Sequence, residues 1–339
     1  MGRLLRHVVE ATAHAEQLGT APDGSVRVLN AATMTLLDAG QLDTSRPLVN
    51  RALAIARAQL GADHPSTLTA RSNMAYWLGA SRQVGEAISQ LRPLLEDWVR
   101  VLGPDHPDTL ITRNYLAYWL GVSGQAREAI GQLRRLLKDM VRVLGPNHTL
   151  ATRSNLARWL GRSGQTREAI GQFRRLLKDR TRVLGPDHLR TLATRSNLAY
   201  WRGASGQADE AVSQFRRLLE DDVRVLRPDH LPTLSTRRNL ADWLGMSGHA
   251  DEAVGQLRQL LDDMLRVLGP DHPSTLVTRS NLAFWLGASG QTEEAVGRAQ
   301  RLLEDRVRVL GPDHPDTLAT GRYLSGWDEG PGKQSIDPA

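Results

Sequence analysis

Apolar residues recur at helical spacing along the chain, and residues 109–145 show the pattern clearly. In TLITRNYLAYWLG, Leu116 and Leu120 fall on one face of a predicted helix. Gly124 follows in VSGQ and can adopt the positive φ that ends a helix. The next stretch, AREAIGQLRRLLKDMVRVLG, has a broad apolar face opposite a basic one and ends at Gly145, before a proline. The segment therefore predicts two helices joined by a short turn.

This hairpin repeats along almost the whole chain. The histidine of the LGPDHP segment marks each copy, at His64, His106, His148, His188, His230, His272 and His314. The step is 42 residues except once, where it is 40 because GPNHTLATR lacks two residues that GPDHPDTLITR has. A weaker copy covers residues 26–61. Because a single hairpin cannot bury its apolar face, successive hairpins must stack. The sequence predicts an all-α fold, an α-solenoid of stacked antiparallel helix hairpins.

The repeat divides the chain into three predicted segments. Residues 1–25 are expected to form an N-terminal helix or half-repeat cap, and residues 328–339 a disordered tail. Residues 26–327 are expected to form the array, with about seven hairpins and one terminal helix. The last copy stops after its first helix, which leaves an end open for stacking. This end could be covered by the tail or could join two copies in a homo-oligomer.

The pattern LGPDHPxTLxTRxNLAxWLGxSGQxxEAIxQLxxLL resembles the tetratricopeptide repeat (TPR), in the 42-residue form of kinesin light chain. Its most specific parts are NLA, the G-Q turn, the E-A pair and the LGPDHP linker. The segment AGQLDTSRPLVNRALAIARAQLGADHP is also similar to the TPR arrays that follow NTPase domains in bacterial STAND/NB-ARC regulators. The resemblance implies a TPR superhelix that binds protein segments. GPGKQS (330–335) does not complete a phosphate-binding loop, so the chain would be a sensor part or a stand-alone relative.

One column of first-helix residues is asparagine, an unfavourable residue inside a helix. It comprises Asn73, Asn155, Asn197, Asn239 and Asn281. In the family that the chain resembles, the matching asparagine faces the concave groove and hydrogen-bonds the backbone of an extended peptide, which suits an amide with both donor and acceptor. The alternative is a hydrogen bond to the neighbouring repeat. Tyr115 and Tyr323 replace the asparagine, so we expect the peptide contact to be shifted or lost there.

The position three residues after the asparagine varies in chemistry, although its neighbours are uniform. It reads Tyr76, Tyr118, Arg158, Tyr200, Asp242 and Phe284. Residues three apart share a helix face, so this column is also predicted to face the groove, where varied residues can specify a ligand. Arg162 and Arg238, with Arg158, make the middle of the groove basic. The predicted ligand is therefore an acidic protein or peptide segment with an aromatic anchor.

The Asp-His pairs of the LGPDHP loops could pass for fragments of an active site. Each pair belongs to a separate hairpin, and neighbouring helices pack about 8–10 Å apart, too far for the imidazoles to converge on one site. The aspartate is instead expected to cap the next helix, with a proline in the first turn. The arginine and glutamate columns are interpreted as a repeated salt bridge or surface network.

The tryptophans form another column at the same period and are predicted to pack between repeats. A surface on which bases or sugars stack is the alternative. Two residues stand out from the pattern. Trp98 lies outside the column and is predicted to be exposed at the surface. Arg202 replaces a leucine, which indicates either a packing defect or a charge in the groove.

Composition and charge narrow the function further. The chain has no cysteine, which excludes disulfides and thiolate metal sites and fits the cytoplasm. No run approaches the roughly 18 apolar residues of a membrane span. The net charge of +6 permits a nucleic-acid partner, but the arginines lie beside Glu and Asp on polar helix faces, which disfavours one. No nucleophile–base pair, cofactor motif or metal cluster is recognisable.

These observations predict a non-enzymatic scaffold that binds a protein segment, with a sensor or regulatory role as its extension. No cofactor and no metal are expected, and no membrane association. Two alternatives are kept from the sequence. The array could bind single-stranded RNA through its helical repeats, or it could be a self-assembling structural solenoid.

Overall fold

The computed structural model describes residues 7, 10–12, 14, 20–38 and 41–328. This part of the chain is built from consecutive helices and contains no strand. Its contacts separate two compact units, Met1–Gln172 and Phe173–Ala339, here called unit 1 and unit 2. Residues 329–339 of the predicted tail, including GPGKQS (330–335), lie outside the described residues, as does most of the predicted N-terminal cap.

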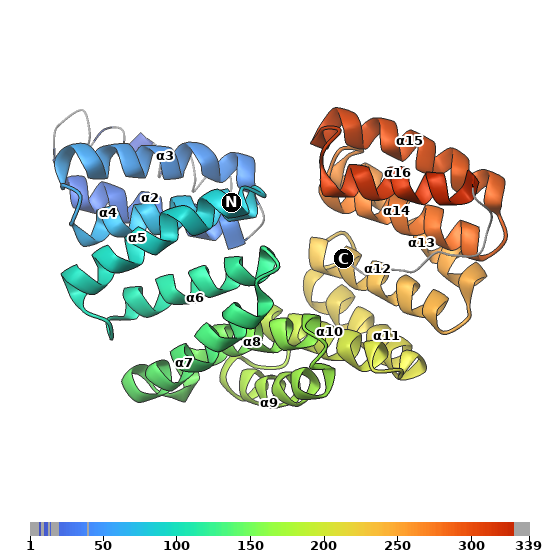
Figure 1. The fold of residues 1–339 in the computed structure, drawn as a ribbon, viewed down its shortest axis with the longest axis horizontal. Coiled ribbons are helices and arrows are strands. Elements are labelled where there is room, and N and C mark those ends of the chain that lie inside the picture. The colour runs from blue at the N-terminus through green and yellow to red at the C-terminus, as the bar shows by residue number, and fades with distance from the viewer. Residues whose placement is uncertain (1–6, 8–9, 13, 15–19, 39–40, 329–339) are drawn as a thin grey trace. The chain divides into compact units, whose positions relative to one another are not determined.

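Unit 1 consists of helix hairpins in chain order (Figure 1). They are α2 (Pro22–Asp38) with α3 (Leu42–Gln59), α4 (Pro65–Ala80) with α5 (Val84–Leu102), α6 (Pro107–Val122) with α7 (Ala126–Leu144), and α8 (Leu150–Arg162) followed by α9 (Thr166–Leu184). The boundary between the units falls within α9. The second helices α3, α5 and α7 also pack on the first helix of the next hairpin, as α5 does on α6.

Unit 2 continues with the same element order. It contains α10 (Leu189–Ala204) with α11 (Ala208–Leu226), α12 (Leu231–Met246) with α13 (Ala250–Leu268), α14 (Pro273–Ala288) with α15 (Thr292–Leu310), and α16 (Pro315–Asp328). Within each hairpin and between hairpins the helices pack consecutively. The predicted all-α solenoid of stacked helix hairpins is confirmed.

The LGPDHP loops begin each first helix in a way that corrects the sequence prediction. The residue at the N-cap is the histidine, and not the aspartate before it. At His64, His106, His188, His272 and His314, imidazole Nδ1 accepts a hydrogen bond of 3.1–3.2 Å from the backbone N–H two residues later. The described histidine N-caps have extended backbone, for example φ −65° and ψ 140° at His106, which aims the ring at the first turn.

The aspartate of the loop instead contacts the second helix of the hairpin that follows the loop, as Asp105 before α6 contacts α7. Arginines of that helix bind it at 2.6–3.2 Å in the pairs Arg100–Asp63, Arg142–Asp105, Arg224–Asp187, Arg266–Asp229 and Arg308–Asp271. The hydrogen bond from Arg142 lowers the pKa of Asp105, and Arg100 does the same for Asp63. Both residues of the loop therefore act on the hairpin that follows it: the histidine caps its first helix, and the aspartate binds the last turns of its second helix.

The shortened repeat shows what the loop contributes. Between α7 and α8, the residues Pro146–Thr149 form a 3-10 turn, η1, and Thr149 stands at the N-cap of α8 without a side-chain hydrogen bond to it. Leu150–Arg162 is also shorter than the other first helices. The two missing residues thus removed the histidine cap and the first turn of the helix.

Glycine and tryptophan form the tightest contact between hairpins. A Cβ added to Gly79, Gly121, Gly203 or Gly245 would lie 2.2–2.5 Å from the indole of the next repeat, at Trp119, Trp159, Trp243 or Trp285. These four indoles are buried. The tryptophan column therefore packs between repeats, as predicted, and each ring occupies the space that a side chain on the preceding first helix would need. The side chain of Trp327 lies outside the described residues.

Trp98 was predicted to be exposed, and that prediction is wrong. Its side chain is 1% exposed and its Nε1 donates to the Ser72 hydroxyl at 3.2 Å. The position belongs to a buried column of the second helices. Its other members are Met140, Arg180, Asp222, Met264 and Arg306. Because this column contains both apolar and charged residues, the sequence wrongly indicated a surface position.

Candidate functional site

The thirteen residues of the predicted peptide site all lie on first helices. Within unit 1, α4 contacts α6 and α6 contacts α8; within unit 2, α10 contacts α12 and α12 contacts α14. We call the two sets of residues the first-helix face of each unit. In unit 1 the set is Asn73, Tyr76, Tyr118, Asn155, Arg158 and Arg162; in unit 2 it is Asn197, Tyr200, Arg238, Asn239, Asp242, Asn281 and Phe284.

The asparagine column makes hydrogen bonds to the preceding hairpin. Asn73 is 3% exposed, and its Nδ2 donates to the Asn30 carbonyl and side-chain oxygens at 3.3 and 3.2 Å. Asn155 Nδ2 donates to Asn114 Oδ1 at 3.2 Å. Asn239 Nδ2 makes a longer contact, 3.5 Å, with the Ser196 hydroxyl. The sequence left two roles open for this column, and these contacts are the second of them, a hydrogen bond to the neighbouring repeat.

Asn197 differs from the rest of the column. Its Nδ2 donates to the carbonyl of Ala193 in the preceding turn of its own helix, at 2.8 Å. The side chain is half-buried on α10. In unit 2, this asparagine therefore reaches its partner without using the neighbouring hairpin.

A polar cluster surrounds Asp242 on the first-helix face of unit 2. Asn281 Nδ2 donates to both carboxylate oxygens at 2.8 and 2.9 Å, and Trp285 Nε1 donates to Oδ1 at 3.1 Å. Burial raises the pKa of Asp242 to about 6, against the opposing effects of Trp285, Arg238 and Asn281. Burial also lowers the pKa of Arg238, and the charge of Asp242 opposes that shift. The cluster therefore connects α12 to α14 through a carboxyl group that titrates near neutral pH.

The aromatic members of the varied column pack against tryptophans and remain half-buried. Tyr118 lies 5.9 Å from the ring of Trp159 in the next hairpin, and Tyr200 lies 5.7 Å from Trp243. Tyr76 likewise contacts Trp119 at 5.6 Å. One side of each ring thus supports the stack of hairpins, while the other remains partly accessible.

Two basic members of the face, Arg158 and Arg162, lie on α8 in unit 1, and Arg238 lies on α12 in unit 2. Arg162 is exposed, with its guanidinium 5.4 Å from the centre of the Trp159 ring. Arg158 is half-buried one turn earlier, and among the described residues it makes no ion pair. Unit 1 therefore presents positive charge beside Tyr118, whereas unit 2 has the carboxyl of Asp242 in the column.

Many arginines of the second helices are engaged in ion pairs, which bears on the RNA alternative. Arginines near the ends of the second helices bind the loop aspartates that precede the same hairpins, and the arginine column of the first helices binds second-helix aspartates at 2.6–2.8 Å. The latter pairs are Arg71–Asp97, Arg113–Asp139, Arg195–Asp221, Arg237–Asp263 and Arg279–Asp305. These charges stabilise contacts within the protein, which leaves fewer of them for phosphate groups.

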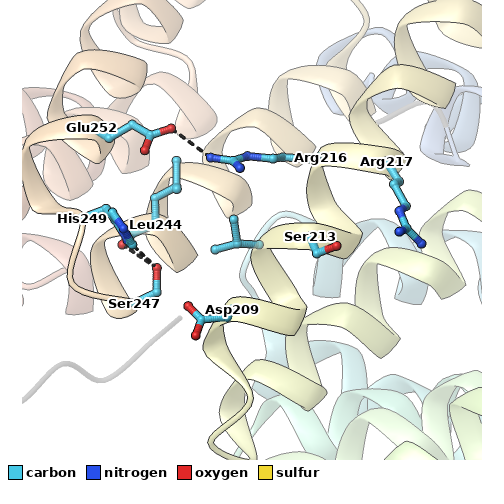
Figure 2. Close-up of a pocket in the computed structure, with 9 residues that line it drawn as sticks. Asp209, Ser213, Arg216, Arg217, Leu244, Ser247, His249 and Glu252 are labelled. Atoms are coloured by element: carbon cyan, nitrogen blue, oxygen red, sulfur yellow. Dashed lines mark hydrogen bonds and ion pairs between the residues drawn. The ribbon is translucent and has the colours of Figure 1, made fainter.

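The sequence interpretation did not anticipate the grooves between second helices. One groove, lined in part by Arg174, Arg202 and Glu210, encloses about 460 Å³. Another, between α11 and α13, encloses about 380 Å³ (Figure 2). The replacement of the repeat leucine by Arg202 was the available signal, but the sequence did not show which side chains surround it.

Two classes of site were also searched for in the part of the chain that the structure describes. No group of three or more His, Asp or Glu side chains is placed to hold a metal ion there. None of the described helices is long and apolar enough to cross a membrane.

Comparisons with known proteins agree with the repeat architecture. One model of the tetratricopeptide repeat matches residues 109–148, 149–190 and 275–316, and a second matches 26–92 and 201–264. A comparison with curated protein sequences found no match. Among solved structures, a kinesin light chain-type protein of nearly identical TPR-like repeats from Podosopora anserina is 28% identical, with 60% of this chain and 97% of that chain covered and a TM-score of 0.50.

Two solved structures of complexes are similar in fold. NprR, in complex with its cognate peptide NprX, is 12% identical and has a TM-score of 0.61 over 90% of this chain and 85% of its own. A Rap protein complexed with Competence and Sporulation Factor is also 12% identical, with a TM-score of 0.61 over 90% and 87%. Because models of one repeat family match the array from its first hairpin to its last, the chain belongs to the tetratricopeptide repeat family.

Proposed function

We propose that the chain is a non-enzymatic interaction module whose first-helix face binds an extended segment of a partner protein. The observation that carries the proposal is the column of half-buried aromatic rings at Tyr76, Tyr118, Tyr200 and Phe284. A ring that is fixed on one side by packing offers apolar area to a partner at little cost in side-chain entropy.

A regulatory role is part of the proposal. NprR is in complex with its cognate peptide NprX, and Rap with Competence and Sporulation Factor, so proteins of similar fold hold a peptide or a named factor. The resemblance of the N-terminal repeats to TPR arrays of bacterial STAND/NB-ARC regulators supports the same role. We place the protein in the cytoplasm, in keeping with its lack of cysteine.

The asparagines are assigned a secondary part in binding. Asn155 and Asn239 each donate a side-chain N–H to the preceding hairpin. Their amide oxygens remain able to accept a hydrogen bond from the backbone of a peptide. Asn197 donates its N–H within its own helix and is half-buried, and we assign it the strongest peptide contact of the column. Asn73 is too deeply buried to share this role.

The charge of the face selects the partner. In unit 1, Arg158 and Arg162 lie on α8, whose Trp159 contacts Tyr118, so an acidic segment with an aromatic anchor complements this face in charge. The paired arginines of the second helices weigh against RNA as the ligand. Self-assembly through the last hairpin stays a prediction.

The proposal is tested with a fluorescein-labelled acidic peptide that has one central tryptophan, and with a counterpart in which lysines replace the acidic residues. Fluorescence polarisation should detect binding of the acidic peptide by the full chain. Arg158→Glu should weaken that binding at least about tenfold and strengthen binding of the lysine peptide. Arg135→Glu on α7, an exposed second-helix residue, provides the control with the same charge change. Equal binding of both peptides by the wild type, or equal effects of the two variants, would contradict the proposal.

A further inference from the structure

A repeated ion pair links successive second helices. It joins an arginine of one helix to the glutamate near the start of the next, in the pairs Arg92–Glu128, Arg134–Glu168, Arg216–Glu252 and Arg258–Glu294, at 3.9, 3.0, 3.1 and 2.7 Å. Figure 2 shows Arg216 directed at Glu252 across the groove between α11 and α13, with Leu244 between the helices. In this groove the arginine is neutralised by the facing carboxylate.

The groove between α9 and α11 breaks this pattern. The repeat places Arg174 and Glu210 where the pair would form. Glu210 instead accepts hydrogen bonds from Arg202 Nη1, at 3.2 Å, and from Gln214. Arg202 occupies the repeat position that Leu244 has in the next groove. Its guanidinium binds the carboxylate of Glu210, which the repeat pattern would pair with Arg174. In the described part of the chain, Arg174 consequently has no ion pair.

The resulting pocket is strongly basic. It has a volume of about 460 Å³, and four arginines line it: Arg174, Arg195, Arg202 and Arg217. Glu210 is the one carboxylate among its lining residues. Arg195 is neutralised by Asp221 at 2.7 Å, but Arg217 forms no ion pair with any described residue. An adjoining cavity of about 340 Å³ is also lined by Arg174, Arg202 and Glu210. The pocket thus holds more positive charge than its own carboxylate can balance.

We propose that this pocket of unit 2 binds a small organic phosphate. Guanidinium groups bind phosphoryl oxygens through paired, charge-assisted hydrogen bonds, and Arg174, Arg202 and Arg217 can share one phosphoryl group. Leu177 and Leu198 provide an apolar wall for the organic part. The volume lies in the range of pockets for small molecules.

This site is separate from the proposed peptide site. None of the residues that line the pocket belongs to the first-helix face as defined above. The two proposals can therefore fail independently. A ligand in the pocket would contact α10 and α11 through Arg202 and Arg217, two successive helices of unit 2.

The test is isothermal titration calorimetry of the full chain with ADP, pyrophosphate, adenosine and citrate. ADP and pyrophosphate should bind, adenosine should not, and citrate should bind at least about tenfold more weakly than ADP. Arg202→Leu restores the repeat residue and frees Glu210 to pair with Arg174. It should weaken ADP binding at least about tenfold while the melting temperature stays equal or rises.

Arg216→Leu is the matched control, since it removes one positive charge from the next groove (Figure 2). It should leave ADP affinity within about twofold of the wild type, because the removed charge belongs to another pocket. The proposal is overturned if the wild type binds neither ADP nor pyrophosphate, or if citrate or adenosine binds as tightly as ADP. Equal affinity of Arg202→Leu and wild type would overturn it too, as would equal losses in the two variants.

Discussion

One buried position of the second helices is apolar in unit 1 and mostly charged in unit 2. It holds Trp98 and Met140 in unit 1, and Arg180, Asp222, Met264 and Arg306 in unit 2. Most of these residues bind a threonine of the following first helix. The hydroxyl donates to the sulfur of Met140 at 3.2 Å and to the carboxylate of Asp222 at 2.6 Å, and accepts from Arg180 at 2.6 Å.

The comparison teaches that the repeat determines the burial of this position but not its polarity. A threonine hydroxyl can donate or accept, so it satisfies one polar atom of whichever side chain it meets. This hydrogen bond does not offset the free-energy cost of removing a charged side chain from water. Burial raises the pKa of Asp222, whose Oδ1 accepts no hydrogen bond from a described residue. Unit 2 therefore carries an energetic cost that unit 1 lacks.

The largest expected effects come from exchanging the chemistry of this column. Trp98→Ala should reduce the free energy of unfolding by about 3–5 kcal/mol, because it leaves a large cavity in unit 1. Asp222→Met should raise it by up to about 2 kcal/mol, because methionine is native at this position in two other hairpins and still accepts from Thr236. Differential scanning calorimetry of both variants measures the pair of effects. A loss for Asp222→Met as large as that for Trp98→Ala would refute the comparison.

Arg227 marks a second irregularity of unit 2. It has φ 83° and ψ 158° at the C-cap of α11, where the other second helices have glycines such as Gly145 and Gly269. Side chains other than glycine are strained in this conformation, so Arg227→Gly should stabilise the protein by about 1 kcal/mol. Gly269→Arg in the next loop is the reciprocal variant and should destabilise it. Urea unfolding compares the two, and changes of the same sign would contradict this explanation.

Asp242 predicts a pH effect specific to unit 2. Its pKa is about 6 in the folded protein against 3.8 in the unfolded chain, so the folded state binds the proton more tightly. The contribution of this group to stability is therefore fully present below about pH 3.8 and is lost as the pH rises to about 6. Asp242→Asn should remove this component, so that the melting temperatures of variant and wild type differ more at pH 7 than at pH 4. A constant difference across this range would exclude the assignment.

The smallest effect is expected at the exposed loop pairs that both units share. Arg142 binds Asp105 at 2.7 Å, with both side chains largely exposed. Solvent and salt screen such a pair, so Arg142→Ala should change the melting temperature little, and less at high salt. A large loss would show that the loop pair stabilises the hairpin stack more than its exposure suggests.

The helices and their stacking could be predicted because the period, the glycine turns and the tryptophan column all repeat. Errors arose where a residue's surroundings come from another helix. The cap was assigned to the aspartate because carboxylates commonly cap helices, yet Arg142 binds Asp105 and the imidazole of His106 caps. Trp98 was placed at the surface because its column varies.

The candidate site was predicted in part. The sequence located the asparagine column and the varied column on first helices, but it could not show that Asn73 is buried against Asn30 or that Asn281 binds Asp242. Those contacts depend on the stagger of neighbouring hairpins. The pocket at Arg202 escaped prediction for the same reason, since its partners Arg174 and Glu210 lie on two other helices.

The central claim, that the first-helix face holds the partner, is tested most directly by site-specific photocrosslinking. Benzoylphenylalanine is introduced in place of Tyr118 on α6 or, in a second variant, of Arg135 on α7, and each protein is irradiated with the fluorescein-labelled acidic peptide. The account predicts a crosslinked product for position 118 and none above background for position 135. Crosslinking at position 135 alone, or equally at both positions, would contradict it.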